Sequence, residues 1–128
     1  MTIPGLSKMQ KRGYLHRDLK PDNILLMKGK KVDYRLADFG FCLKHNIYSD
    51  RNIAGTKEYV SPKLLVKFEN NKISVSGHTI KDDVYSYGKT LLEMMTLEIG
   101  IPYKKDILVK LKKSYDDSLV NLLRAMLE

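Results

Sequence analysis

The sequence contains very little cysteine, no tryptophan and no long apolar run. Cys42 is the single cysteine among 128 residues, which excludes an intrachain disulfide and suits a reducing compartment. No segment approaches the roughly 18–20 apolar residues of a membrane span, and residues 1–13 lack the apolar core of a secretory signal. We therefore expect an intracellular protein, cytoplasmic or nuclear, with no membrane partner.

Acidic residues are also scarce relative to basic ones, at 15 against 23, which gives a formal net charge of +8. Five lysines fall between Lys104 and Lys113. A nucleic acid or a membrane surface could bind such a patch, but the segment lacks the interleaved aromatics and glycines expected of RNA binding. We interpret it as a solvated helix face, so a nucleic-acid partner is disfavoured, while an acidic or regulatory protein partner remains open.

The chain length and an apolar content of 43% favour one domain of mixed, mainly helical structure. Residues 24–27 and 31–36 are predicted to be strands joined by a turn at 28–30, because Val32, Tyr34 and Leu36 alternate with polar residues. Residues 41–54 are predicted to be a loop, and 70–79 a polar link. Helices are predicted at four places, residues 6–12 (with Gly13 as the cap), 83–96, 107–112 and 118–127. The expected fold class is therefore α+β, mainly α, with a short β-hairpin.

Two short motifs flank the predicted hairpin. The first is the eight-residue run His16-Arg17-Asp18-Leu19-Lys20-Pro21-Asp22-Asn23, which brings a carboxylate, an ammonium and a carboxamide close together. The second is Asp38-Phe39-Gly40. Together they resemble the catalytic loop and the magnesium loop of a eukaryotic-type protein kinase.

The resemblance extends along most of the chain. Residues 55–62 (Gly-Thr-Lys-Glu-Tyr-Val-Ser-Pro) resemble the end of a kinase activation segment, where the substrate peptide docks. Residues 83–88 (Asp-Val-Tyr-Ser-Tyr-Gly) resemble the start of the central helix of the C-terminal lobe. The resemblance therefore implies a protein-kinase-like C-terminal lobe that transfers the γ-phosphoryl group of ATP to a protein hydroxyl.

The resemblance also assigns roles to individual residues. Asp18 would be the base that accepts the proton of the attacking hydroxyl, and Lys20 would contact the phosphate. Asn23 and Asp38 would be the magnesium ligands, since magnesium prefers oxygen donors. Leu25 would lie under the adenine ring, and it could also be part of the strand core, since the two roles are not exclusive. The implied cofactors are ATP and Mg²⁺.

Three residues point to the class of acceptor. Kinases that phosphorylate Ser or Thr carry Lys at the position of Lys20, and in that class a Thr at the position of Thr56 hydrogen-bonds the Lys and the catalytic Asp. We interpret Asp18, Lys20 and Thr56 as one set that favours a Ser/Thr hydroxyl on a protein substrate.

The resemblance predicts four supporting features around this set. His16 would be structural and stack under Phe39, and Asp83 would hold the backbone of the catalytic loop. Arg17 is at the position that binds an activation-loop phosphate in many kinases, and Ser49 in that loop is the candidate phosphorylation site. Cys42 is expected to be a partly buried apolar residue rather than a redox switch.

Some kinase features are missing from these 128 residues. They contain no glycine-rich phosphate loop, and Lys63 stands where the family usually has a Glu that forms a buried ion pair. Either a gene under relaxed selection or a divergent lineage would explain Lys63. We expect residues 1–128 to be a partial kinase domain, a C-terminal lobe truncated at both ends with the N-terminal lobe absent, and to be inactive alone. The alternative is a non-catalytic kinase remnant that serves as an interaction module.

Overall fold

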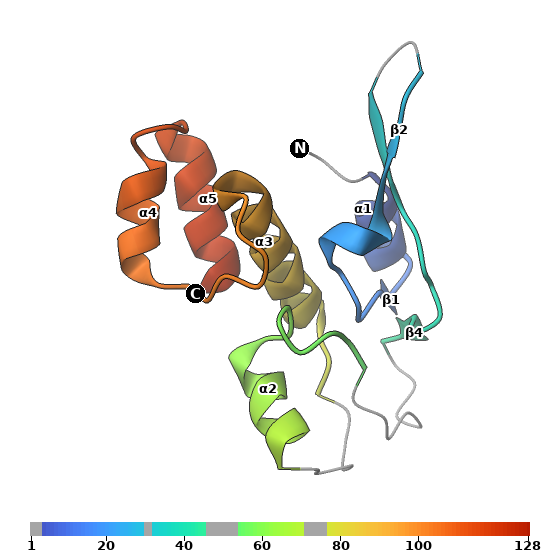
Figure 1. The fold of residues 1–128 in the computed structure, drawn as a ribbon. Helices are drawn as coiled ribbons and strands as arrows, with labels where there is room; N and C mark the ends of the chain where they lie inside the picture. The colour runs from blue at the N-terminus through green and yellow to red at the C-terminus, as the bar shows by residue number, and fades with distance from the viewer. Residues whose placement is uncertain (1–3, 30–31, 46–53, 71–76) are drawn as a thin grey trace.

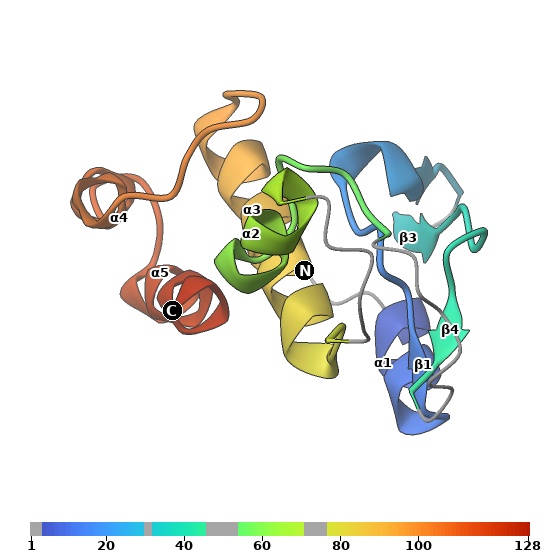
Figure 2. The same cartoon turned by 90° about the horizontal axis from the view of Figure 1, so that it is seen from below.

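The computed structural model describes residues 4–29, 32–45, 54–70 and 77–128. A long helix, α3 (Ile80–Thr96), runs through the middle of the molecule. Helices α4 (Lys105–Leu111) and α5 (Asp117–Leu127) lie on one side of α3, and α1 (Pro4–Lys11) and the strands lie on the other (Figure 1). The same order holds in the view from below (Figure 2), so α3 separates two regions.

The predicted hairpin is confirmed. Strands β2 (Ile24–Met27) and β3 (Asp33–Leu36) pair antiparallel, with Ile24 opposite Leu36. A short 3-10 helix, η1 (Pro21–Asn23), leads into β2. The turn residues 30–31 lie outside the described part of the chain.

The prediction of a loop over residues 41–54 is wrong at its start. Strand β4 (Leu43–Lys44) pairs antiparallel with β1 (Tyr14–Leu15), so the residues just before the first motif are tied to those just after the second. A two-residue pairing between distant segments has no periodicity that the local sequence could reveal. Residues 46–53, which include Ser49, lie outside the described residues.

The predicted helices are present with shifted ends. Helix α3 begins at Ile80 rather than at residue 83, because Thr79 and Asp82 form a capping box: the backbone N–H and the hydroxyl of Thr79 donate to Asp82 Oδ2 at 2.7 and 2.9 Å. The sequence analysis missed α2 (Pro62–Glu69), which begins at a proline, a residue favoured in the first helical turn. No described helix combines the length and apolarity needed to cross a membrane.

The main apolar core lies between α3, α4 and α5. Seven buried residues form it: Leu92, Met95, Leu108, Leu111, Val120, Leu123 and Leu127. Gly88 allows the close approach of α3 and α5, because a Cβ at this position would lie 2.9 Å from Met126 Cβ. A second, smaller cluster of Leu6, Leu19 and Leu36 joins α1, the first motif and β3.

The face of α3 that points away from this core is buried but polar. Asp82, Asp83, Ser86 and Thr90 are all buried, whereas Met94 is 39% exposed. Although Val84, Tyr87, Leu91, Leu92, Met94 and Met95 together predict a helix that is apolar around most of its circumference, one face of α3 is polar. Polar burial requires hydrogen-bond partners. Ser86 and Thr90 donate to backbone oxygens of α3 itself, whereas Asp82 and Asp83 accept from the motif segments.

Candidate active site

The first motif is a buried loop made largely of polar residues. His16 is fully buried, and Arg17, Asp18 and Asn23 are 5–7% exposed. Arg17 also has a left-handed backbone with φ of 68°, which is uncommon for a residue with a branched or long side chain. Buried polar groups and a strained backbone persist only where the surroundings hold them, and such features cluster at functional sites.

Asp83 holds the backbone of this loop. The backbone amide of His16 donates to Asp83 Oδ2 at 2.7 Å, and that of Arg17 donates to Oδ1 at 2.9 Å. Asp83 is fully buried in the first turn of α3, and His78 Nε2 lies 3.4 Å from its Oδ1. Hydrogen bonds to a charged acceptor are about twice as strong as neutral ones, and they offset the strained conformation of Arg17.

Asp18, Lys20 and Thr56 come together in space. The hydroxyl of Thr56 donates to Asp18 Oδ1 at 2.7 Å, and Lys20 Nζ donates to the oxygen of Thr56 at 2.9 Å. Lys20 Nζ also lies 3.4 Å from Asp18 Oδ2. The three residues, predicted as one set, form a closed triangle in which a carboxylate and an ammonium share a hydroxyl.

Asn23 completes the surroundings of the Asp18 carboxylate. Its Nδ2 donates to the backbone oxygen of Asp18 at 2.9 Å and to Asp18 Oδ2 at 3.2 Å. Because the amide nitrogen faces Asp18, the amide oxygen is directed away from it. Asn23 is 6% exposed and ends η1, so both a rigid turn and burial fix its orientation.

Asp38 lies two residues beyond the end of the hairpin at Leu36, on the side of Asn23. The amide of Ala37 donates to the backbone oxygen of Asn23 at 2.9 Å, which extends the β2–β3 pairing up to Asp38. Asp38 is exposed and has φ of 56°, and its Oδ1 accepts the amide of Gly40 at 3.2 Å. Among the described hydrogen bonds and ion pairs, none joins Asp38 to the side chain of Asn23.

The donor set at this place fits magnesium that arrives with a nucleotide. Asn23 offers an amide oxygen and Asp38 a carboxylate oxygen, both hard donors. The described residues contain no group of three or more His, Cys, Asp or Glu side chains that could hold a metal. Two protein donors suit Mg²⁺, which usually keeps waters and phosphate oxygens as its other ligands.

His16 and Phe39, predicted to stack, are neighbours, but their rings are tilted rather than stacked. The rings of His16 and Phe39 lie 5.6 Å apart at 58°, and His16 Nε2 is 3.1 Å from the oxygen of Ala37. Arg17 Nε donates to the oxygen of Phe41 at 2.6 Å, which ties the two motif loops together. Leu25 is 47% exposed on β2, so it is not strand core and its side chain is open to a ligand.

Cys42 lies beside this loop, with Sγ 4.0 Å from the oxygen of His16. Burial, together with the nearby charge of Asp83, raises the pKa of the Cys42 thiol to about 11. The neutral thiol therefore dominates at physiological pH, which agrees with the interpretation of Cys42 as an unreactive packing residue.

Two side-chain pairs that the sequence analysis missed fasten residues 54–61 to α3. The hydroxyl of Ser61 donates to Asp82 Oδ1 at 2.5 Å, and that of Tyr59 donates to Glu93 Oε2 at 2.6 Å. Burial and the bond to Glu93 raise the pKa of Tyr59, so the phenol remains a donor. The spacing of Thr79 and Asp82 could have revealed the capping box, but these two long-range pairs have no local signal.

Lys63, the departure from the family pattern, is exposed on α2. Its Nζ donates to the backbone oxygen of Gly77 at 2.9 Å, so it holds the chain just before α3. Asp82, the partner of Ser61, is 4% exposed. Although its burial acts in the opposite direction, the hydrogen bonds from Ser61 and Thr79 lower the pKa of Asp82. The buried carboxylate of Asp82 therefore links Ser61 to α3, and the group that donates to its Oδ1 is a hydroxyl rather than a basic side chain.

Residues 1–125 match the family described as "Protein kinase domain". The chain is 33% identical over 97 residues to mitogen-activated protein kinase kinase kinase 8 of Rattus norvegicus, an alignment that covers 74% of this chain and 18% of the relative. It is 39% identical over 100 residues to the serine/threonine-protein kinase mrck-1 of Caenorhabditis elegans, covering 73% of this chain and 6% of the relative. With serine/threonine-protein kinase MRCK gamma of Mus musculus the identity is 44% over 73 residues, covering 55% of this chain and 5% of the relative. The chain thus spans less than a fifth of the length of these relatives.

Proposed function

The chain belongs to the protein kinase domain family, and from this premise we propose that it is the mainly helical C-terminal lobe of a Ser/Thr-type protein kinase. In this proposal the lobe takes part in transferring the γ-phosphoryl group of ATP to a Ser or Thr hydroxyl of a protein. Kinases of this family use ATP with Mg²⁺ and act on protein substrates. The specific substrate class and the binding of ATP by this chain are parts of the proposal.

The observation that supports the proposal most strongly is the arrangement around Asp18. Thr56 donates to one carboxylate oxygen, while Asn23 and Lys20 lie at the other, at 3.2 and 3.4 Å. A carboxylate oxygen has two lone pairs, so Oδ1, which accepts from Thr56 alone in the described hydrogen bonds, retains a lone pair that can accept the proton of a substrate hydroxyl. Three partners fix the orientation of the base before a substrate arrives, which is how positioning lowers the barrier.

The proposed roles follow from these positions. Bound ATP–Mg²⁺ would supply the phosphoryl group and neutralise part of its charge. Asp18 would hold the acceptor hydroxyl and take its proton as the hydroxyl oxygen bonds to phosphorus and ADP leaves. Lys20, at 2.9 Å from Thr56, would place its positive charge beside the transferred group. Asn23 and Asp38 would orient the metal-bound phosphates, and Leu25 would contact the base of the nucleotide.

Thr56 supports the preference for Ser or Thr. Its hydroxyl joins Lys20 to Asp18, so the ammonium is held close to the proposed base. A short aliphatic alcohol can approach a base flanked in this way, and residues 55–61, fastened to α3 by Ser61 and Tyr59, would form the platform for the peptide around it.

The test is a chimera that joins these residues to the glycine-rich lobe of a related Ser/Thr kinase. Because general-base catalysis contributes about 10²–10⁴-fold, we expect Asp18→Asn to lower kcat by at least about a hundredfold. The control, Cys42→Ser, should leave phosphate transfer to a Ser/Thr peptide within about twofold, since Cys42 is an unreactive thiol. Equal losses from the two changes, or a preference for Tyr over Ser peptides, would contradict the proposal. Residues 1–128 assayed alone are expected to show no transfer.

A further inference from the structure

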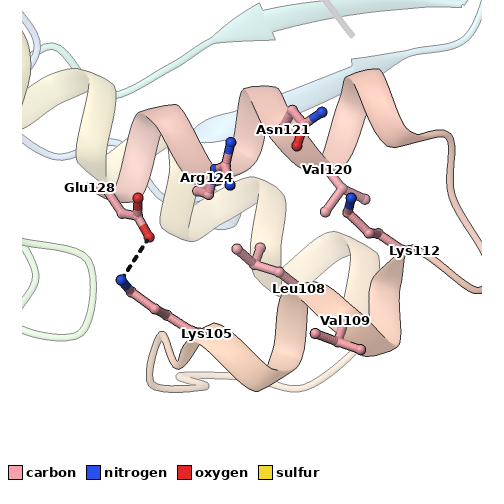
Figure 3. A pocket seen from close by; sticks show the side chains of 8 residues that line it. All are labelled: Lys105, Leu108, Val109, Lys112, Val120, Asn121, Arg124 and Glu128. Carbon is pink, nitrogen blue, oxygen red and sulfur yellow. Dashed lines mark ion pairs between the residues drawn. The ribbon is translucent and has the colours of Figure 1, made fainter.

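A groove lies between α4 and α5, on the side of α3 opposite the Asp18 site (Figures 1 and 3). We call it the α4–α5 groove. Its floor is apolar: Leu108 and Val120 are 8% and 1% exposed, and Val109 at the edge is 65% exposed. Its volume is about 260 Å³, with basic residues on both helices around the floor.

The charges at the rim are predominantly positive. Three of the four charged residues that line the groove are basic, namely Lys105, Lys112 and Arg124, and the fourth is Glu128. Glu128 is already engaged, because Lys105 Nζ lies 3.8 Å from its Oε1 and the hydroxyl of Tyr103 donates to the same oxygen at 2.9 Å (Figure 3). The single acidic residue therefore does not neutralise the rim.

These basic groups can exchange partners at little cost. Lys112 Nζ lies 3.3 Å from Asp117, but both side chains are exposed, and ion pairs of this kind contribute little to stability. Among the described residues, no ion pair or side-chain hydrogen bond involves the guanidinium of Arg124. A guanidinium offers a planar fork of donors that matches a carboxylate in a bidentate arrangement.

We propose that the α4–α5 groove binds an acidic segment of a partner protein, with one apolar side chain of that segment on the floor and its carboxylates on Arg124, Lys112 and Lys105. The volume is below the roughly 300–1,000 Å³ of small-molecule pockets, so it suits one side chain rather than a cofactor. An apolar anchor surrounded by charge-assisted contacts at the rim is the usual design of a protein-recognition site.

The same features disfavour other occupants. The lining includes no aromatic residue on which a nucleic-acid base could stack. Helix α4 has seven residues, and the surface is concave, whereas membrane-surface helices present a long convex apolar face. An acidic peptide with one aliphatic residue could place that residue on the apolar floor and pair its carboxylates with the basic residues of the rim.

The experiment measures binding of purified residues 1–128 to a short fluorescein-labelled peptide that has one leucine between two runs of aspartate and glutamate. Fluorescence anisotropy should show saturable binding, and Arg124→Glu should weaken it by at least about tenfold, because a hydrogen bond to a charged group is worth more than that factor. Lys81→Glu is the matched control: it makes the same charge change at an exposed position on α3. It should change the affinity less than about twofold, since Lys81 does not line the groove and its exposed charge is screened by salt.

Changes in the peptide test the two parts of the site separately. Replacing its leucine by glutamine, or its acidic residues by their amides, should each reduce the affinity. In an NMR titration of the labelled chain, the shifted amide signals should belong to α4 and α5 and not to residues 14–27. Circular dichroism of Arg124→Glu should match the unchanged chain, since Arg124 is exposed.

Several outcomes would overturn the proposal. Equal weakening by Lys81→Glu would indicate general attraction to the net charge of the chain, and NMR shifts elsewhere would remove the peptide from the groove. Stronger Arg124-dependent binding to RNA or to anionic vesicles than to the peptide would assign the rim to another ligand. Arg124-dependent self-association in ultracentrifugation would assign the groove to a second copy of the chain.

Discussion

The side chains that are buried on the two sides of α3 differ in kind. Toward α4 and α5 the buried residues are apolar, with Leu92 and Leu123 fully buried. Toward the first motif polar and charged residues are buried beside the small cluster of Leu6, Leu19 and Leu36, and His16 and Asp83 are fully buried. An apolar core tolerates substitutions that conserve volume, whereas a buried polar network is destabilised as soon as one partner is lost.

One helix, α3, therefore both contributes to the apolar core and holds the polar segments that carry the proposed site. Helix α3 presents leucine and methionine to α5, which provides generic hydrophobic stability. Its first turn presents carboxylates to backbone amides and hydroxyls of distant segments. On the α4–α5 side, stability depends on how well apolar side chains pack. On the side of the first motif, it depends on individual hydrogen bonds that also position the proposed catalytic residues.

Of the substitutions that test this difference between the two sides, Asp83→Ala is expected to lower the free energy of unfolding most. Two buried amides, those of His16 and Arg17, would lose their acceptor, so we expect a loss of about 4 kcal/mol in the free energy of unfolding. Urea denaturation followed by circular dichroism measures it. Asp117→Ala, at an exposed residue, is the control. In the chimera, Asp83→Ala should also abolish transfer, and a loss below about 1 kcal/mol would show that Asp83 does not hold the loop.

Leu123→Ala tests the apolar side. Leu123 is fully buried, so its truncation should lower the free energy of unfolding by about 3 kcal/mol, within the range for buried leucines. Leu122→Ala, one residue away and 55% exposed, should cost much less. The chimera should keep its kcat per folded molecule in Leu123→Ala, unlike in Asp83→Ala. If Leu123→Ala lowered kcat without lowering stability, the apolar side would also position the proposed catalytic residues, and the distinction between the two sides would be wrong.

A smaller and pH-dependent effect is expected from Ser61→Ala. The folded-state pKa of Asp82 is lowered, so its contribution to stability is present above its unfolded pKa of about 3.9 and is lost as the pH falls through the folded value. Removing the Ser61 hydroxyl should therefore cost about 1.5 kcal/mol at pH 7 and less at pH 3. Unfolding measured across this range checks it, and a cost that stays constant with pH would exclude the charged hydrogen bond as its source.

The smallest effect on stability is expected from Cys42→Ser, below about 1 kcal/mol, because the side chain is partly buried and nearly isosteric. A sharper test is the alkylation rate of Cys42. Since burial raises its pKa from 9.0 to about 11, the thiolate fraction at pH 8 should be about a hundredfold lower than in the urea-unfolded chain. Iodoacetamide labelling followed by mass spectrometry measures both rates. Equal rates would show that the thiol is exposed and ordinary.

The periodicity of apolar residues along the sequence predicted those strands and helices that are formed by contiguous residues. The alternation up to Leu36 predicted the hairpin, and helical periodicity predicted α3 and α5 with errors of one to three residues at their starts. The β1–β4 pairing was missed because it joins two-residue segments that lie far apart along the chain. Helix α2, which begins at Pro62, was also missed. The meeting of Asp18, Lys20 and Thr56 came from the family resemblance. The bonds of Ser61 and Tyr59 to α3 join residues 21 and 34 positions apart, and no spacing along the chain encodes them.

Gly88 gives the molecule a mechanical property. With no side chain at this position, the backbone of α3 lies directly against Met126 and Leu127 of α5. Two helices in such close contact cannot slide or rotate past each other without a clash, because packed interiors yield little. The position of α5 is therefore fixed relative to α3, the helix whose first turn bears Asp83 and, through it, holds the amides of the loop that contains Asp18.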